Sequence, residues 1–146
     1  MKGVRSVLLV HNEPDAFRGL EGTLHEQQVQ TRHAHDCGEA RSMLRDAGVD
    51  LVLTDALLPD GTWKDAIRLV RQVAKGTPVI VMSRIVSMQL YLDTQDGGAA
   101  DFIVPPMTPR DLAYVLTVAM ARAWPPQIGG SQSPISRGSG GYLQVA

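Results

Sequence analysis

Short aliphatic runs alternate with amphipathic stretches along the first 124 residues of this 146-residue chain, and no other feature constrains its fold as strongly. Each run is bounded by polar or turn residues, which is typical of β-strands. Four runs are rich in Val, Ile and Leu on both faces, which indicates parallel strands buried between helices. The polar run, Val29–His35, is therefore predicted at an edge of the sheet. The other predicted strands are Ser6–Val10, Leu51–Thr54, Val79–Met82 and Asp101–Val104.

The stretches between these strands carry apolar side chains at steps of three or four residues, the spacing of one face of a helix. Helix-start signals agree, because Asp36, Thr62 and Thr108 are each followed three residues later by an acidic residue, as in a capping box. Five strand–helix units predict an α/β fold: a doubly wound, five-stranded parallel sheet with helices on both faces. The apolar positions are Phe17, Leu20 and Leu24, then Ala40, Met43, Leu44 and Ala47, then Ile67, Val70, Val73 and Ala74.

Charge and composition exclude several classes of function. Fourteen basic and fifteen acidic residues give a formal charge of −1, so no basic surface indicates nucleic acid or anionic lipid as a partner. The apolar runs are too short for a membrane span or a signal peptide. The single cysteine, Cys37, excludes an internal disulfide and fits a reducing compartment. These observations predict a cytoplasmic domain that binds neither membranes nor nucleic acid.

Composition changes abruptly after Trp124. Of the 22 residues from Pro125 to Ala146, twelve are Gly, Pro or Ser, and Arg137 is the only charged one. Such a segment buries too little apolar surface to offset its ordering entropy. We therefore expect residues 1–124 to form the folded domain and residues 125–146 to be a flexible tail or linker. No DNA-binding module is evident after residue 124, so output is expected from the surface of the domain or from sequence outside these 146 residues.

Polar residues gather where the predicted strands end. In a doubly wound sheet, ligands and reactive groups collect at the carboxyl ends of the strands. The residues at those ends are His11-Asn12-Glu13, Asp55, Ser83 and Pro105-Pro106.

Four segments in order and at matching spacing make residues 4–124 resemble the receiver domain of bacterial response regulators. They are Val7–Val10 before a polar triplet, Asp50–Asp55 with Pro59, Thr77–Ser83, and Gly98–Val104 followed by Pro106 and Thr108–Leu112. The resemblance implies strand order 2-1-3-4-5 and a role in two-component phosphorelay signalling. It also implies partners, namely a histidine kinase or phosphotransfer protein that supplies a phosphoryl group and a downstream protein that receives the signal.

The resemblance assigns roles to single positions. Asp55 takes the place of the phosphoacceptor aspartate, and Ser83 that of the hydroxyl residue that bonds the phosphoryl group. Phe102 takes the place of the switch aromatic. Pro106 matches a proline whose preceding peptide bond is usually cis, so the Pro105–Pro106 bond is predicted to be cis.

Three positions depart from the family pattern. His11 and Asn12 stand where the family has two adjacent carboxylates that hold Mg²⁺, and Pro105 stands where it has a lysine. Mg²⁺ prefers hard oxygen ligands, so with only Asp55 and Asn12 left we expect it to bind weakly or not at all. The missing lysine removes a charge-assisted contact of roughly 1.5–3 kcal/mol.

Two side chains leave alternatives open. A protonated His11 could pair with Asp55 in the space of the metal and the lysine, or it could be a neutral ring bonded to backbone at a strand end. Cys37 lies at a helix start, where a thiolate is favoured, but no paired histidine or CxxC motif supports a redox role.

The chain is therefore interpreted as a degenerate receiver domain, not an enzyme, that acts mainly through protein contacts. The alternative is a conventional receiver phosphorylated on Asp55 by a histidine kinase. A small doubly wound enzyme is a third hypothesis, disfavoured because no phosphate-binding loop or acid–base pair is present.

An association surface is also predicted. Residues 85–92 carry no charge, and the last helix has a second apolar stripe besides its core face. We expect a homodimer or a partner site over residues 85–92 and 112–124. The core face is Leu112, Val115, Leu116 and Ala119, and the second stripe is Ala113, Thr117, Met120 and Trp124.

Overall fold

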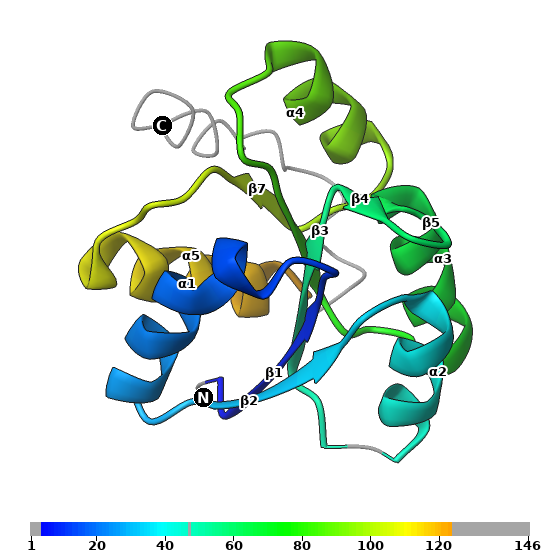
Figure 1. The fold of residues 1–146 in the computed structure, drawn as a ribbon, viewed down its shortest axis with the longest axis horizontal. Helices are drawn as coiled ribbons and strands as arrows, with labels where there is room; N and C mark the ends of the chain where they lie inside the picture. The colour runs from blue at the N-terminus through cyan, green and yellow to red at the C-terminus, as the bar shows by residue number, and fades with distance from the viewer. Residues whose placement is uncertain (1–3, 47, 124–146) are drawn as a thin grey trace.

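The computed structural model describes residues 4–46 and 48–123 and places five parallel strands in one central sheet (Figure 1). The strand order is β2-β1-β3-β6-β7, which confirms the order 2-1-3-4-5 because β6 and β7 are the fourth and fifth strands of this sheet. The strands are β1 (Ser6–Val10), β2 (Gln30–Ala34), β3 (Leu51–Asp55), β6 (Val79–Met82) and β7 (Asp101–Ile103).

The polar strand β2 lies at one edge of the sheet, as predicted, and pairs only with β1 among the described strands. Its residues are exposed or half-buried up to the buried Ala34, whereas every residue of β1 and β3 is buried. The polar composition of the strand thus matches its position. The opposite edge is β7, which has three residues.

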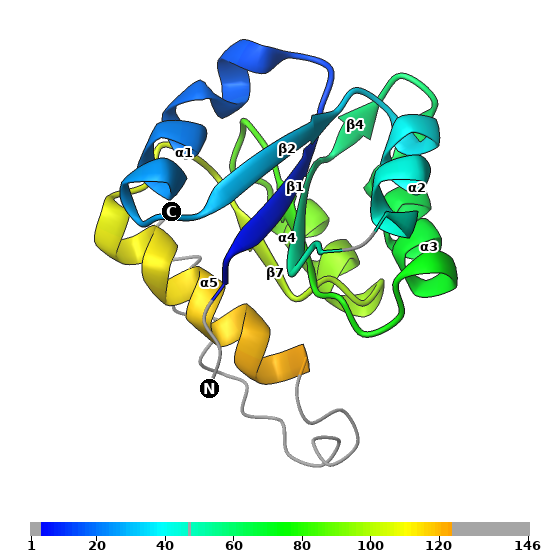
Figure 2. The same cartoon turned by 90° about the horizontal axis from the view of Figure 1, so that it is seen from below.

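Helices cover both faces of the sheet (Figures 1 and 2). One core contains Val7 and Leu9 of β1, and the other contains their neighbours Leu8 and Val10, as the alternation of a strand requires. The first core is closed by α1 (Pro14–Glu26) and α5 (Pro109–Ala123), and the second by α2 (Cys37–Arg45), α3 (Trp63–Val73) and α4 (Met88–Asp96).

The predicted caps at Asp36, Thr62 and Thr108 each accept a hydrogen bond from a backbone N–H of the first helical turn. Thr62 and Asp65 form a reciprocal capping box. At the start of α2 the reciprocal hydrogen bond of a capping box is absent. The carboxylate of Glu39 accepts from the backbone N–H of His35 instead of from that of the cap residue Asp36.

A small hairpin was not predicted. β4 (Leu57–Leu58) and β5 (Gly61–Thr62) pair antiparallel directly after Asp55, and they shape the loop that leads from β3 into α3. Strands of two residues carry no periodicity from which to predict them.

Further predictions concern the last helix, the loop before it and the C-terminus. Leu112, Val115, Leu116 and Ala119 are buried, as predicted for the core face of α5. The Pro105–Pro106 peptide bond is cis, which confirms that prediction. Within the described ranges no helix is both long and apolar enough to cross a membrane. The predicted tail, residues 125–146, lies outside the described residues.

Candidate functional site

The carboxyl ends of β3 and β6 open into a cavity of about 880 Å³. Three predicted site residues, Asn12, Asp55 and Ser83, line it together. Four charged residues without a predicted role, Glu13, Lys64, Arg84 and Asp93, line it as well. The predicted site residues His11, Phe102 and Pro105 are not among its lining residues.

Asp55 ends β3 with a side chain that is 10% exposed and therefore largely withdrawn from water. Burial raises the pKa of this carboxyl above its ordinary value, because the charged form loses solvation. The Arg84 guanidinium and the backbone N–H groups of Ala56 and Leu57 act against the rise.

Arg84 supplies the positive charge nearest to Asp55. Its Nη2 lies 3.0 Å from Oδ2 of Asp55 and 3.0 Å from Oε1 of Glu13. Arg84 and Glu13 lie in the loops after β6 and β1, and Asp55 is the last residue of β3, so the three meet at the carboxyl ends of the strands. A signal for Arg84 was present in the sequence, because it directly follows Ser83 at a strand end, where the sheet collects polar groups.

The hydroxyl of Ser83 bonds within its own loop. Ser83 Oγ donates to the carbonyl oxygen of Ile85 at 2.9 Å and accepts from the N–H of Ile85 at 3.1 Å. The side chain therefore closes a tight turn between β6 and α4. It lines the same cavity as Asp55, as the resemblance implies, but its hydrogen bonds hold the loop.

His11 does not pair with Asp55, so that alternative is wrong. The ring is 2% exposed, stacks on Phe17 with centroids 4.4 Å apart, and bonds through Nε2 to Nδ1 of His33 at 2.9 Å. Burial is the largest cause that lowers the pKa of His11, followed by the neighbouring His33. The second alternative, a neutral ring, is the better description, although its hydrogen bond to the side chain of His33 was not predicted.

Phe102 and Pro105 lie on and after β7. Phe102 is 3% exposed and packs edge-on against Tyr91 of α4, with ring centroids 6.1 Å apart. A movement of the Phe102 ring would therefore change its packing against Tyr91 and so against α4. Pro105 is half-buried and, like any proline, carries neither a charge nor a backbone N–H.

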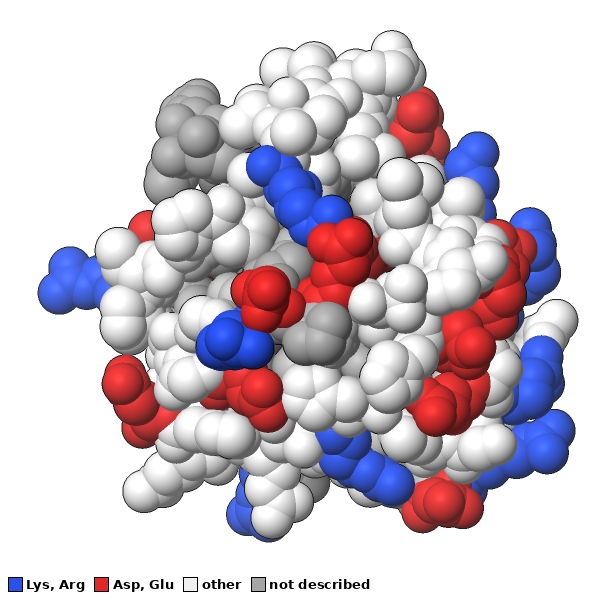
Figure 3. Space-filling view, viewed as in Figure 1, with Lys and Arg blue, Asp and Glu red and all other residues white. Residues whose placement is uncertain are grey.

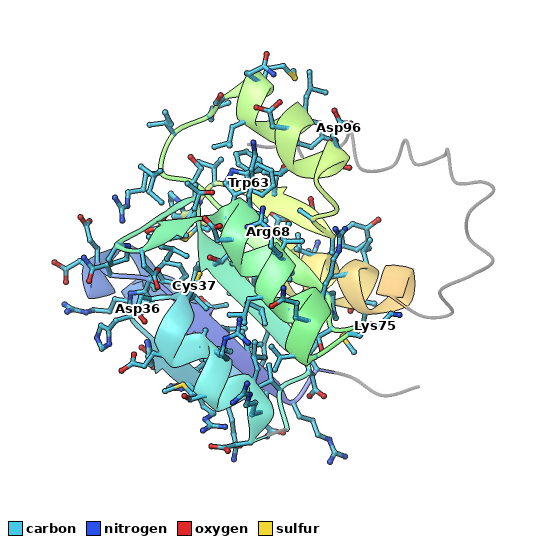
Figure 4. The ribbon with its side chains drawn as sticks, turned by 90° about the vertical axis from the view of Figure 1, so that its right-hand side faces the viewer. Asp36, Cys37, Trp63, Arg68, Lys75 and Asp96 are labelled. Carbon is cyan, nitrogen blue, oxygen red and sulfur yellow. The ribbon has the colours of Figure 1, made fainter. Side chains whose placement is uncertain are left out.

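Cys37 also differs from expectation. Although it begins α2, burial raises the pKa of its thiol to about 11, and Asp60, Asp65 and Asp36 add to the rise. Figure 4 shows Asp36 and Cys37 together at the start of α2. The surrounding carboxylates outweigh the helix terminus, so no thiolate is favoured here.

The family model for the response regulator receiver domain matches residues 7–117, and the chain belongs to this family. It is 33% identical over 116 residues to the response regulator protein PilR of Pseudomonas aeruginosa, covering 80% of this chain and 26% of PilR. The chain spans about half the length of other curated relatives that it matches.

Solved receiver structures share the fold. A response regulator receiver domain protein from Clostridium thermocellum superposes with a TM-score of 0.71 at 18% identity, covering 82% of this chain and 96% of that one. The beryllofluoride-activated NtrC4 receiver domain dimer gives a TM-score of 0.72 at 20% identity, covering 81% and 98%.

Receiver domains typically bind Mg²⁺ for phosphorylation, but the donor set of this chain does not fit that ion. No group of three His, Cys, Asp or Glu side chains that could hold a metal occurs among the described residues. The ring of His11 is bonded to His33, and the carboxylates of Asp55 and Glu13 are paired with Arg84. Asn12 is left with one neutral amide oxygen, and Mg²⁺ in proteins usually takes one or two carboxylates.

Proposed function

We propose that this receiver domain signals mainly through protein contacts, with little or no phosphorylation of Asp55. The observation that carries the proposal is the ion pair between Arg84 and Asp55. Phosphoryl transfer depends on positioning and charge neutralisation, which Mg²⁺ and a lysine normally supply. Here Pro105 replaces the lysine, and the acceptor carboxylate is already engaged by a side chain of the same chain.

An exposed apolar surface supports the second half of the proposal. Leu57, Ile85, Val86, Met88 and Leu92 are 74%, 68%, 60%, 58% and 47% exposed. They lie on α4, on the loop before it, and on β4. Figure 3 shows this upper part of the molecule as largely uncharged. Contiguous exposed apolar surface is typical of protein–protein contacts.

The contribution expected of α5 is smaller. Met120 packs against the core, Ala113 is half-buried, and the Thr117 hydroxyl bonds to the carbonyl oxygen of Ala113 in its own helix. Trp124 lies outside the described residues. The predicted stripe thus offers little apolar area, and the contact surface centres on residues 85–92. A second copy of the chain is the proposed occupant, and the NtrC4 receiver of the same fold is itself a dimer.

The runner-up is a conventional receiver phosphorylated on Asp55 by a histidine kinase. The cavity is open, and the side chain of Arg84 is 47% exposed, so an arriving phosphoryl donor would meet a cation at the acceptor. In either case we propose a cytoplasmic, non-enzymatic domain with a downstream protein partner.

Labelling with acetyl phosphate separates the two candidates. Intact-mass spectrometry in the presence of Mg²⁺ should find little or no adduct on the wild-type chain. Asp55→Asn is the control, because any specific adduct must disappear in it. Rapid Mg²⁺-dependent labelling that Asp55→Asn abolishes would establish the conventional receiver instead.

Self-association tests the contact surface separately. Combining Ile85→Asp with Met88→Lys places two charges on the apolar surface and should shift sedimentation equilibrium towards monomer. Glu26→Lys, at an exposed position of α1, is a charge-changing control and should leave association unchanged. A strictly monomeric wild-type chain at high concentration would contradict the homodimer.

A further inference from the structure

Arg84 stands where a cation would bridge the acidic side chains of the cavity. A single nitrogen, Nη2, lies 3.0 Å from an oxygen of Asp55 and 3.0 Å from an oxygen of Glu13. The two carboxylates come from the last residue of β3 and from the loop after β1, and the guanidinium reaches them from the loop after β6. One positive group thus joins two loops of the site to the end of β3.

A divalent ion and this guanidinium would compete for the same oxygens. An ion held by Asp55 and Glu13 would lie within a few ångströms of the Arg84 charge, and like charges at that distance repel strongly when partly shielded from water. The chain offers no second cation beside Asp55 in the part that the structure describes, since Lys64, also on the cavity wall, has no ion pair with it. Arg84 must move away before a metal can bind.

We infer that Arg84 is the resident cation of this site, taking the place of a divalent ion and excluding it. The inference rests on the proposed function, because it explains how the site keeps a fixed charge without metal or phosphoryl group. Arg84 also directly precedes Ile85 and Val86 of the apolar surface. The ion pairs of Arg84 therefore also tie the loop between β6 and α4, which carries Ile85 and Val86, to the end of β3 and to the loop after β1.

Metal titration of the isolated chain tests the inference. Trp63 lines the cavity, so its fluorescence reports binding there, and Trp124→Phe removes the second tryptophan from all samples. Loss of the free Mn²⁺ signal in electron paramagnetic resonance gives an independent measure. We expect no saturable Mg²⁺ or Mn²⁺ binding to the parent chain at millimolar concentration.

Two substitutions of Arg84 separate charge from size. Arg84→Met keeps much of the length and removes the charge, and it should gain saturable binding, with a dissociation constant at least about tenfold below the highest metal concentration at which the parent shows none. Arg84→Lys keeps the charge and should gain none. Adding Asp55→Asn to Arg84→Met should abolish the gained site.

Arg68→Met is the matched control, because Arg68 also pairs with a carboxylate, Asp65, at 2.9 Å, but on the surface of α3. It should not change metal binding. Circular dichroism confirms that each variant is folded, and Arg84→Gln replaces Arg84→Met if the latter unfolds.

Three results would overturn the inference. They are metal binding by the parent chain as tight as by Arg84→Met, no metal binding by either folded uncharged variant, and a gained site that survives Asp55→Asn. None of them involves a kinase or a partner protein. They are therefore distinct from failure of the proposed function, which the labelling and association experiments measure.

Discussion

Nε2 of His11 lies 2.9 Å from Nδ1 of His33, whose Nε2 lies 2.8 Å from a carboxylate oxygen of Glu21. A carboxylate only accepts, so Nε2 of His33 donates to it. When the His33 ring is neutral, its Nδ1 accepts and Nε2 of His11 donates. The three side chains form a chain of hydrogen bonds that runs from the end of β1 across β2 to α1.

The neutral state of His11 predicts a loss of stability on acidification. Because the folded pKa lies below the ordinary value of 6.5, the unfolded chain binds more protons as pH falls through that value. The stabilisation by the neutral His11 ring is complete above pH 6.5, and it is lost as the pH falls from 6.5 to the folded pKa of His11. Urea unfolding between about pH 7.5 and pH 5 should show the free energy of unfolding falling more steeply for the wild type than for His11→Gln.

The comparison rests on His11→Gln itself, because His35 also helps to lower the pKa of His11 and is no independent control. Glu21, whose pKa is also lowered, changes the pH dependence of stability only below its ordinary pKa of 4.5, which lies outside the measured range. A wild-type slope equal to that of His11→Gln would contradict the buried neutral ring.

Removing the charge of Arg84 should destabilise the fold. Breaking a fully buried ion pair costs about 3–5 kcal/mol, and because Arg84 is half-exposed we expect about 1–2 kcal/mol for Arg84→Met at neutral pH. The pKa of Asp55 is already raised and rises further without Arg84. The deficit is therefore present above the folded pKa of Asp55 in the variant and shrinks as pH falls through it.

A double-mutant cycle with Asp55→Asn checks the pairing. If Arg84 acts through Asp55, the two substitutions are non-additive, with a coupling energy of at least about 0.5 kcal/mol. Strict additivity in denaturant unfolding would mean that Arg84 stabilises the fold by other contacts, such as that with Glu13.

The Cys37 thiol should react slowly. A rise of the pKa from 9.0 to about 11 lowers the thiolate fraction near neutral pH about a hundredfold, so alkylation by iodoacetamide should be slower than that of a model cysteine peptide by a similar factor. Asp60→Asn removes the carboxylate that contributes most to the raised pKa of Cys37 after burial, so it should accelerate the reaction. Equal rates for the wild type and the peptide would show that the thiol is not held protonated.

Restoring charges should restore labelling of Asp55. His11→Asp, Asn12→Asp and Pro105→Lys supply the two carboxylates and the lysine, and adding Arg84→Met removes the competing cation. We expect acetyl phosphate and Mg²⁺ to label the quadruple variant at least about tenfold faster than the wild type. The effects of the individual substitutions on the labelling rate should be non-additive. The triple variant, which keeps Arg84, should have a labelling rate between those of the wild type and the quadruple variant. A quadruple variant that stays unlabelled would show that the site lacks more than the missing charges.

The strands were predictable because burial determines their composition. Ser6–Val10 and Val79–Met82 have the bounds that their aliphatic runs indicate, and β2 lies at the edge that its polar residues require. The site was predictable only in part. Asp55 and Ser83 meet because the carboxyl ends of neighbouring parallel strands always meet.

The contacts of Arg84 and His11 were not predictable from one sequence. Whether Arg84 reaches Asp55 depends on how the loop after β6 lies relative to the end of β3, which is far from it in the chain. The orientation of the His11 ring depends on the register of β2, which places His33 opposite Leu9 and within reach of the ring. Local patterns carry neither kind of information.

The two edges of the sheet have a consequence for aggregation. A long, flat, apolar edge strand is a template on which another chain can add a strand, and this can continue into fibrils. Here one edge strand carries Arg32 and His33, and the other, Asp101–Ile103, is too short to pair over many residues. Copies of this domain are therefore expected to meet through helix and loop surfaces, and concentrated solutions should not develop thioflavin fluorescence.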